Sequence, residues 1–268
     1  MIVETKHIEY EYGDTITLKP FGDVHLGARA CDIRAFKKYL SNSDDKTYFM
    51  CIGDYYDAIV VQDRRYQKST DATIGDAIID QQIEQGINLL EPYKDRLLGM
   101  ALGNHENVVI KRAGTDMIAR TCDALNVPHL GYSGLYRLVF REKNGRGRTV
   151  VIRYHHGWGG GSRTQGADLT KFSRDLVYWD ADIFLFGHVH RKQTDEIPRL
   201  SLAGNKLLSK PMIVAICGTF LKTYIDGRMA TYSEVKGYPP ISVGGVMINI
   251  RPDKSWVHLE ARLDSGYD

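Results

Sequence analysis

The stretch Tyr48-Phe49-Met50-Cys51-Ile52-Gly53-Asp54, residues 48–54, joins an apolar run to an acidic residue. A short, uninterrupted apolar run bounded by a glycine is typical of a strand buried within a sheet. The stretch therefore predicts a buried strand that ends at Gly53 and delivers the carboxylate of Asp54 to the following loop.

Four further segments end in the same way, with a polar or metal-ligating residue directly after a predicted strand. These strand ends are Phe21-Gly22-Asp23, Gly103-Asn104-His105, His155-His156-Gly157 and Gly187-His188-Val189-His190. Open α/β sheets place their binding crevices at the carboxyl ends of strands, so we expect all five ends to converge on one site.

Between these strands lie segments in which apolar residues recur at helical spacing. Asp32 can cap the first of these predicted helices. The predicted helices cover residues 33–40, 74–90, 115–125 and 169–179. The polar stretch 62–71 is predicted to be a loop. Helices alternating with strands indicate a layered α/β fold.

Two hairpins are predicted from alternating polar and apolar residues. The first covers residues 8–19 around Gly13-Asp14, and the second covers residues 135–154 around the turn Asn144-Gly145. Late strands are expected over residues 246–250 and 256–263, and no repeat or linker marks a boundary. We therefore expect one domain over residues 1–268.

Composition restricts the class of protein. The 35 Lys and Arg residues nearly balance the 33 Asp and Glu residues, for a formal charge of +2, so an anionic substrate must be attracted locally. No apolar run is long enough to cross a membrane and the amino terminus is polar, which predicts a soluble, cytoplasmic protein without a membrane partner. The cysteines are widely spaced and are expected to be reduced, mostly buried thiols: Cys31, Cys51, Cys122 and Cys217.

The chemistry-bearing residues form five ordered blocks. They are Asp23-x-His25, Gly53-Asp54-x-x-Asp57, Gly103-Asn104-His105-Glu106, His156-Gly157 and Gly187-His188-x-His190. In this order they resemble the motifs of calcineurin-like metallophosphoesterases. A single block could be a hydrogen-bonded pair at a strand end, but that alternative needs five coincidences in order. The resemblance implies a four-layer α-β-β-α sandwich of two mixed β-sheets flanked by helices, with metals at one edge.

The resemblance also implies a dinuclear metal centre. Asp23, His25 and His190 would bind one ion. Asn104, His156 and His188 would bind the other, with Asp54 as the bridging carboxylate. Mn²⁺ is favoured by the resemblance, and mixed oxygen and imidazole ligands also suit Zn²⁺, Fe, Co²⁺ or Ni²⁺. His155 competes with His156 for its place, and His156 is preferred because the family's ligand directly precedes a glycine.

Other residues have predicted roles around the metals. The resemblance implies that His105 meets the substrate and protonates the leaving oxygen. Asp57 and Glu106 are candidates for orienting His105 or a metal-binding imidazole, with a loop-capping or solvated role as the alternative. Trp158 and Arg163 are candidates for substrate contacts, although a core tryptophan and a solvated arginine explain them equally well.

The substrate prediction depends on two missing arginines. Protein phosphatases of this superfamily continue the second block with Arg-Gly and place an Arg before the third block, whereas this chain has Ala58, Ile59 and Leu102. A clamp for a phosphomonoester dianion is therefore absent there. We expect a metal-activated water to hydrolyse a phosphodiester, with nucleic acid or a nucleotide as the leading substrate and a nuclease as one form of the activity. The alternatives are a phosphomonoesterase acting on a small molecule or protein, and a non-catalytic binding module.

Overall fold

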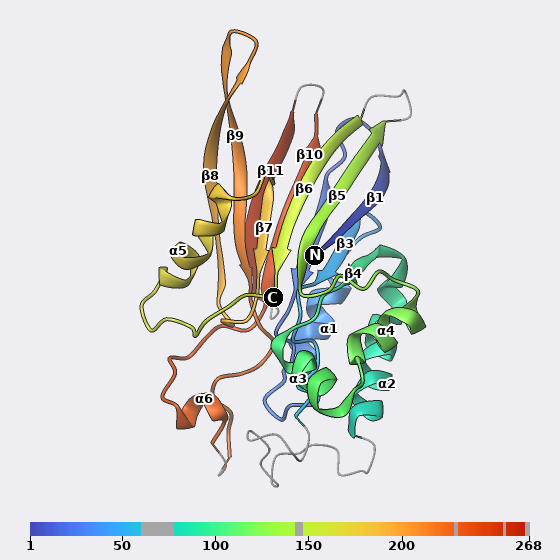
Figure 1. Ribbon diagram of the computed structural model, residues 1–268, viewed down its shortest axis with the longest axis vertical. Helices are drawn as coiled ribbons and strands as arrows, with labels where there is room; N and C mark the ends of the chain where they lie inside the picture. The colour runs from blue at the N-terminus through green and yellow to red at the C-terminus, as the bar shows by residue number, and fades with distance from the viewer. Residues whose placement is uncertain (60–77, 143–146, 228–229, 254–255, 266–268) are drawn as a thin grey trace.

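Two mixed β-sheets pack face to face in a computed structural model that describes residues 1–59, 78–142, 147–227, 230–253 and 256–265 (Figure 1). Among these residues, the five-stranded sheet has the order β11 (Val257–Asp264), β10 (Gly245–Pro252), β2 (Ile16–Phe21), β3 (Thr47–Cys51) and β4 (Leu97–Met100). The six-stranded sheet has the order β1 (Ile2–Tyr10), β5 (Ser133–Glu142), β6 (Gly147–His155), β7 (Ile183–Phe186), β9 (Lys206–Cys217) and β8 (Lys192–Ala203).

Helices cover the outer faces of the two sheets (Figure 1). On the side of the five-stranded sheet lie α1 (Ile33–Ser41), α2 (Ile78–Leu90), α3 (Asn104–Ala113) and α4 (Met117–Leu125), with the 3-10 turn η1 (Glu91–Arg96). On the side of the six-stranded sheet lie α5 (Ala167–Ser173) and the 3-10 turn η2 (Arg174–Val177). The short α6 (Tyr232–Val235) belongs to the connection between β9 and β10.

The central strands bury alternate side chains in different layers of the core. In β3, Met50 faces the core between the sheets, while Phe49 and Cys51 face the helices. In β7, Leu185 faces the core between the sheets, while Phe184 packs with the cluster around α5. Successive residues of a strand point to opposite faces, so each sheet has two buried faces. The predicted four-layer α-β-β-α sandwich is confirmed.

Parallel pairing explains how several strand ends reach one edge. In the five-stranded sheet β2, β3 and β4 are parallel neighbours, and in the six-stranded sheet β6 and β7 are parallel. The loops that follow these strands carry the predicted ligands, and His156 N donates to Tyr132 O while Gly187 N donates to His156 O. The convergence expected at the carboxyl ends of the strands is confirmed.

The first predicted hairpin is wrong. β1 pairs in parallel with β5 in the six-stranded sheet, whereas β2 pairs with β10 and β3 in the five-stranded sheet. Ile8 and Leu18 both face the core between the sheets, so the turn after Tyr10 carries the chain from one sheet to the other. Alternation identified a buried face on each strand, but it does not specify the neighbouring strand.

The other local predictions fare better. Asp32 caps α1 by accepting a hydrogen bond from Ala35 N at 3.0 Å, and β5 and β6 form the predicted antiparallel hairpin. The predicted helix over 169–179 is the shorter α5 followed by η2. Helix α3 and the long β8–β9 hairpin were not predicted. The predicted loop over 62–71, the residues 74–77 of one helix and the Asn144-Gly145 turn lie outside the described residues.

Two predictions from composition can be compared with the structure. All four cysteines are free thiols, and only Cys31 is not fully buried. In the part of the chain that the structure describes, no helix combines the length and the apolar character needed to cross a bilayer.

Candidate metal centre

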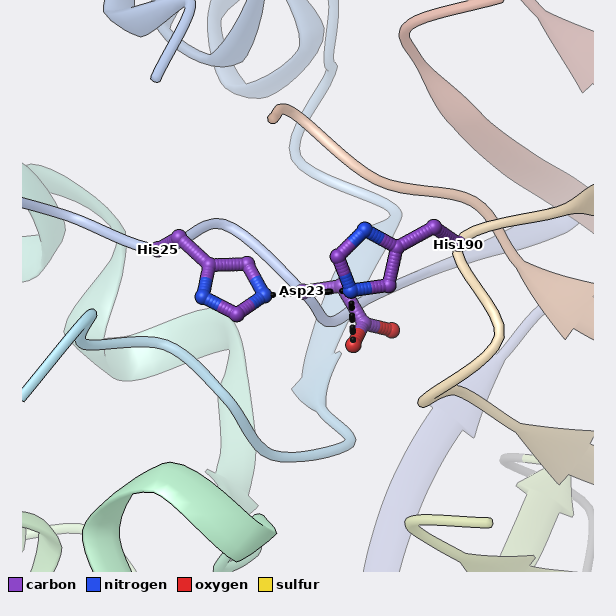
Figure 2. A group of neighbouring side chains, drawn as sticks. All are labelled: Asp23, His25 and His190. Carbon is purple, nitrogen blue, oxygen red and sulfur yellow. Dashed lines mark hydrogen bonds and ion pairs between the residues drawn. The ribbon is translucent and has the colours of Figure 1, made fainter. Parts of the chain in front are cut away.

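Three side chains from two distant loops form a first group of potential metal ligands (Figure 2). His190 Nε2 lies 3.2 Å from His25 Nε2 and 3.4 Å from Asp23 Oδ1. Asp23 is completely buried, and its Oδ1 has no hydrogen-bond partner among the described residues. Two ring nitrogens and a carboxylate oxygen that accepts no hydrogen bond from the described residues face one another, and this arrangement fits a cation because a buried polar atom otherwise pays a desolvation cost.

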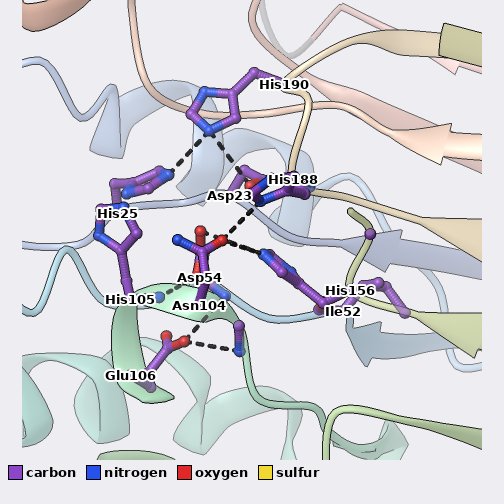
Figure 3. A network of polar contacts seen from close by, with 12 residues as sticks. Asp23, His25, Ile52, Asp54, Asn104, His105, Glu106, His156, His188 and His190 are labelled. Atoms are coloured by element: carbon purple, nitrogen blue, oxygen red, sulfur yellow. Dashed lines mark hydrogen bonds and ion pairs between the residues drawn. The ribbon is translucent and has the colours of Figure 1, made fainter. Parts of the chain in front are cut away.

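A second group lies beside the first (Figure 3). His156 Nε2 is 3.3 Å from Asp54 Oδ2 and 3.0 Å from Asn104 Oδ1, and His188 Nδ1 is 2.7 Å from the same Asn104 oxygen. Asp23 Oδ2 joins the two groups by accepting from His188 N at 2.8 Å. The structure therefore brings together all the residues predicted as ligands.

The backbone at these ligands is unusual. Asp23, His25, Asp54, His188 and His190 all have positive φ angles of 49–72°. A non-glycine residue in this left-handed region costs about 1–3 kcal/mol and persists only where the surroundings impose it. Such conformations cluster at functional sites, so their concentration here supports a functional role for the loops.

Two glycines of the five blocks lie so close to predicted ligands that a side chain would not fit. A Cβ atom at Gly53, where φ is +101°, would lie 2.6 Å from His156 Nδ1, and one at Gly103 would lie 2.0 Å from Asp54 Oδ1. Any larger residue at these positions would displace a predicted ligand.

Neighbouring acceptors orient two of the imidazoles. His156 Nδ1 donates to Ile52 O at 2.9 Å, and His25 Nδ1 lies 3.3 Å from Asp57 Oδ1. Each contact turns the Nε2 atom of the same ring toward the group. This is the arrangement expected of metal-binding histidines, so the predicted orienting role of Asp57 has a geometric basis.

Glu106 holds the backbone rather than an imidazole. Its carboxylate accepts from Gly103 N at 2.9 Å, Tyr56 N at 2.9 Å and Asp54 N at 3.2 Å. These bonds cap the start of α3 and fix the loop that carries Asp54. The loop-capping alternative therefore describes Glu106 better than contact with His105.

His105 lies at the edge of the first group. Its ring is edge-on to the His25 ring at 4.5 Å, and its Nδ1 donates to Asp57 O at 2.6 Å. Because a carbonyl only accepts, Nδ1 carries a proton and Nε2 is the nitrogen that can gain or lose one. His25, Asp57 and His105 also form a third set with donor atoms close enough to hold a cation.

The electrostatics favour a positive charge beside Asp23 and on His156, but not on His190. Burial raises the pKa of Asp23 to about 7, against the effect of the neighbouring histidines. Burial would lower the pKa of His156, but the Asp54 carboxylate outweighs it and raises this pKa to about 10. Burial and the neighbouring His25 hold the pKa of His190 well below its usual value. At Asp23 and His156, therefore, a proton competes with a cation for the same place, whereas His190 stays neutral.

Three other residues with predicted roles lie outside the two groups. His155 points elsewhere: its Nδ1 accepts from Gly157 N at 2.8 Å and its ring packs on Trp158. Trp158 is 38% exposed, and its ring packs edge-on against Phe172 and Phe186, so it is only partly covered by the core. Arg163 lines a cavity of about 440 Å³ beside the first group, and Trp158 does not.

Comparison with known families agrees with this geometry. A protein-family model described as calcineurin-like phosphoesterase matches residues 21–192, which contain all five blocks. The chain belongs to this family. Divalent metals are typical of calcineurin-like phosphoesterases, and the groups of donor atoms described above fit them.

Solved structures of low sequence identity are similar to this calcineurin-like phosphoesterase. Vacuolar protein sorting 29 from Cryptosporidium parvum is 14% identical, with a TM-score of 0.37 over 95% of this chain and 100% of that one. A predicted phosphoesterase from Streptococcus pneumoniae TIGR4 is 12% identical, with a TM-score of 0.33 over 93% of this chain and 99% of that one. The comparison with curated proteins found no match.

Sequence patterns did not identify several residues around the metal centre of this phosphoesterase. Thr219 Oγ1 donates to Asp23 O at 2.7 Å, and Gln82 Oε1 accepts from Ala58 N at 3.2 Å. The ring of Tyr132 is edge-on to the His156 ring at 5.5 Å. None of the three belongs to a motif, so no signal in the sequence could have found them.

Proposed function

We propose that this family member is a phosphodiesterase that uses two divalent cations, with Mn²⁺ favoured. The observation that carries the proposal is the convergence of two imidazole nitrogens on the buried Oδ1 of Asp23, which accepts no hydrogen bond from the described residues. When bound, two divalent ions neutralise charge on the phosphate and lower the pKa of water from about 15.7 towards about 7. Asp23, His25 and His190 would hold one ion. Asn104, His156 and His188 would hold the other, and Asp54 would bridge them.

The chain's own residues supply orientation and proton transfer. Asp57 and the Ile52 carbonyl fix the rings of His25 and His156 before any ion binds. The carbonyl of Asp57 fixes Nδ1 of His105 as a donor, so Nε2 of a doubly protonated ring can give its proton to the leaving oxygen. Rotation of His105 is restricted by this bond, which reduces the ordering cost of the reaction.

The residues at the missing arginine positions support a diester. Ala58 is buried, and Leu102 packs against the helical side of the core. Neither side chain carries a charge that could pair with a terminal phosphate. A phosphodiester carries one negative charge at the reacting phosphate and needs less of a bidentate clamp than a phosphomonoester dianion.

One observation favours phosphomonoester hydrolysis as a second candidate. Arg29 and Arg163 line the cavity beside the metal centre and could meet a terminal phosphate from another direction. A non-catalytic binding module would bind metal and substrate without turnover.

The test compares bis(p-nitrophenyl) phosphate with p-nitrophenyl phosphate in saturating Mn²⁺. We expect a higher kcat/KM for the diester, no hydrolysis after chelation, and recovery when Mn²⁺ is returned. A preference for the monoester would favour the second candidate. Bound metal without hydrolysis of either ester would favour the binding module, and full activity of metal-free protein would exclude the metal mechanism.

A further inference from the structure

One wall of the cavity beside the metal centre comes from a segment outside the family-matched residues. The cavity has a volume of about 440 Å³ and is also lined by His25, His105 and His190. The described residues of 221–241 contribute mainly apolar and aromatic side chains, namely Leu221, Ile225, Tyr232, Tyr238, Pro239 and Ile241. Small-ligand sites commonly have volumes of about 300–1,000 Å³, so a molecule of nucleotide size fits this space.

The base of this wall is bonded to a predicted metal ligand. Asp23 O accepts from Phe220 N at 3.1 Å and from Thr219 Oγ1 at 2.7 Å. Next along the chain, Lys222 N donates to Ala30 O at 2.9 Å. The wall therefore has a fixed position relative to the metal centre, as a specificity-determining surface requires.

Internal hydrogen bonds shape the rest of the wall. Thr223 Oγ1 accepts from Ile241 N at 3.3 Å, Thr223 O accepts from Thr231 Oγ1, and Tyr224 OH donates to Tyr238 O at 2.8 Å. The two threonine hydroxyls thus hold the segment together. Its apolar side chains and tyrosine rings remain as the surface that a ligand would contact.

Two tyrosines on this wall suit an aromatic ligand. Tyr232 is 55% exposed and Tyr238 is 43% exposed, although both line the cavity. Their rings are edge-to-face at 6.4 Å, so one face of a ring can accept a stacked group. Exposed aromatic rings close to cations are the usual platform for nucleic acid bases.

The charges around the cavity suit an anion attached to that group. Arg29, Arg163, Arg191 and Lys222 line it, and Asp57 is the one acidic residue in the described lining. Arg191 donates to Ser162 O and Lys222 pairs with Asp32, so part of this charge is already used within the protein. Such local charge fits a compact anion better than a long polynucleotide, which needs a groove of cations along its backbone.

We infer that the described residues of 221–227 and 230–241 bind the nucleoside of a small nucleotide phosphodiester, with the base against Tyr232 and Tyr238. The reacting phosphate would lie at the metal centre. This inference rests on the proposed phosphodiesterase function and names its substrate class.

The test uses two diesters that share the leaving group p-nitrophenolate: thymidine 5′-(p-nitrophenyl phosphate) and methyl p-nitrophenyl phosphate. Wild-type protein in Mn²⁺ should prefer the thymidine ester in kcat/KM. The double variant Tyr232→Ala/Tyr238→Ala should reduce the ratio of the two kcat/KM values by about 5- to 100-fold, as base stacking on aromatic rings predicts. The matched control is Tyr178→Ala, because Tyr178 is 77% exposed and does not line the cavity. It should leave the ratio unchanged.

Several outcomes would overturn the inference. They are equal kcat/KM for the two esters in wild-type protein, an unchanged ratio in the double variant, and a higher kcat/KM for an oligonucleotide than for the thymidine ester. A calorimetric titration with thymidine 5′-monophosphate separates this inference from the proposed function. If no ester is hydrolysed, the phosphodiesterase proposal fails. Binding of thymidine 5′-monophosphate that the double substitution weakens would still support nucleoside binding by the wall. Absence of such binding would overturn this role of the wall.

Discussion

The two groups of predicted ligands satisfy their donor atoms in different ways. In the first group, His25 Nε2 and His190 Nε2 face each other at 3.2 Å, and Asp23 Oδ1 has no hydrogen-bond partner among the described residues. In the second group, Asn104 Oδ1 lies within 3.0 Å of a ring nitrogen of His156 and within 2.7 Å of one of His188. The second group thus has one oxygen shared by two ring nitrogens, whereas the first group has a single imidazole–imidazole hydrogen bond and an Asp23 oxygen that accepts no hydrogen bond from a described residue.

This difference predicts an order of metal binding. A cation that enters the first group replaces only the hydrogen bond between His25 and His190, and it removes the cost of a buried oxygen that accepts no hydrogen bond within the described part of the chain. A cation that enters the second group must replace the contacts of Asn104. We therefore expect the first group to bind the tighter ion.

The largest effect is expected from Asp54→Asn, which removes a charge that acts on both groups. Asp54 Oδ2 is 3.3 Å from His156 Nε2. Against the effect of burial, the hydrogen bond to Asp57 and then the charge of Asp54 raise the pKa of His25. Both ions should be lost and diester hydrolysis should be abolished, as measured by bound metal per chain and by turnover. By contrast, His190→Ala should lose mainly the tighter ion and Asn104→Ala mainly the weaker one. Retention of both ions in Asp54→Asn would contradict the bridging role.

A smaller effect is expected from His105→Ala, which should reduce kcat by roughly 10²–10⁴ while both ions stay bound. The exposed His7, on β1, offers a matched control in His7→Ala, which should change neither quantity. Because His105 also belongs to the third set of donor atoms, metal content decides between its roles. Loss of an ion in His105→Ala would make it a ligand rather than a proton donor.

The next effect in size is expected from Asp57→Asn, because Asp57 orients His25 in the first group alone. Metal affinity at that group should fall by about 10–100-fold, and affinity at the second group should stay the same. Titration with Mn²⁺ in the Asn104→Ala background measures the first group by itself. The exposed Asp95 provides the control Asp95→Asn. Equal weakening of both ions would show that the two groups are not independent.

The smallest effect is a difference in the pH dependence of metal binding. In the first group, Asp23 has a pKa of about 7, so its proton competes with the cation mainly below pH 7. In the second group, His156 has a pKa of about 10, so its proton competes up to about pH 10. Between pH 7 and 9 the affinity of the second group should therefore rise by about tenfold per pH unit, the effect of one displaced proton, and it should rise less steeply in the first group.

Calorimetric titrations with Mn²⁺ at several pH values would measure both slopes. His190→Ala reports the second group and Asn104→Ala reports the first. A steeper slope in the first group would contradict the charge states inferred for Asp23 and His156.

Much of the site was predictable because its residues follow strands with strong local patterns. Asp23, Asp54 and His188 each stand directly after a glycine and within three residues of a strand end. Parallel pairing then brings these ends to one edge of the sandwich, as the pattern of strands and helices indicated. His156 contacts Asn104 of the second group, whereas His155 contacts Gly157 N. Successive residues of an extended chain point to opposite sides, so only one of the two adjacent histidines can face the group.

The sequence by itself thus predicted which polar residues meet at one edge of the sandwich, their order and the strands that present them. The tertiary structure alone decided that β1 joins the six-stranded sheet and that Glu106 holds the backbone of Asp54 and Tyr56. It also decided that Thr219 donates to Asp23, 196 positions away in the chain. The physical reason is that hydrophobic periodicity records which face of an element is buried, while the partner on that face depends on how whole surfaces pack. Contacts between segments far apart in the chain form only after that packing, so no local pattern encodes them.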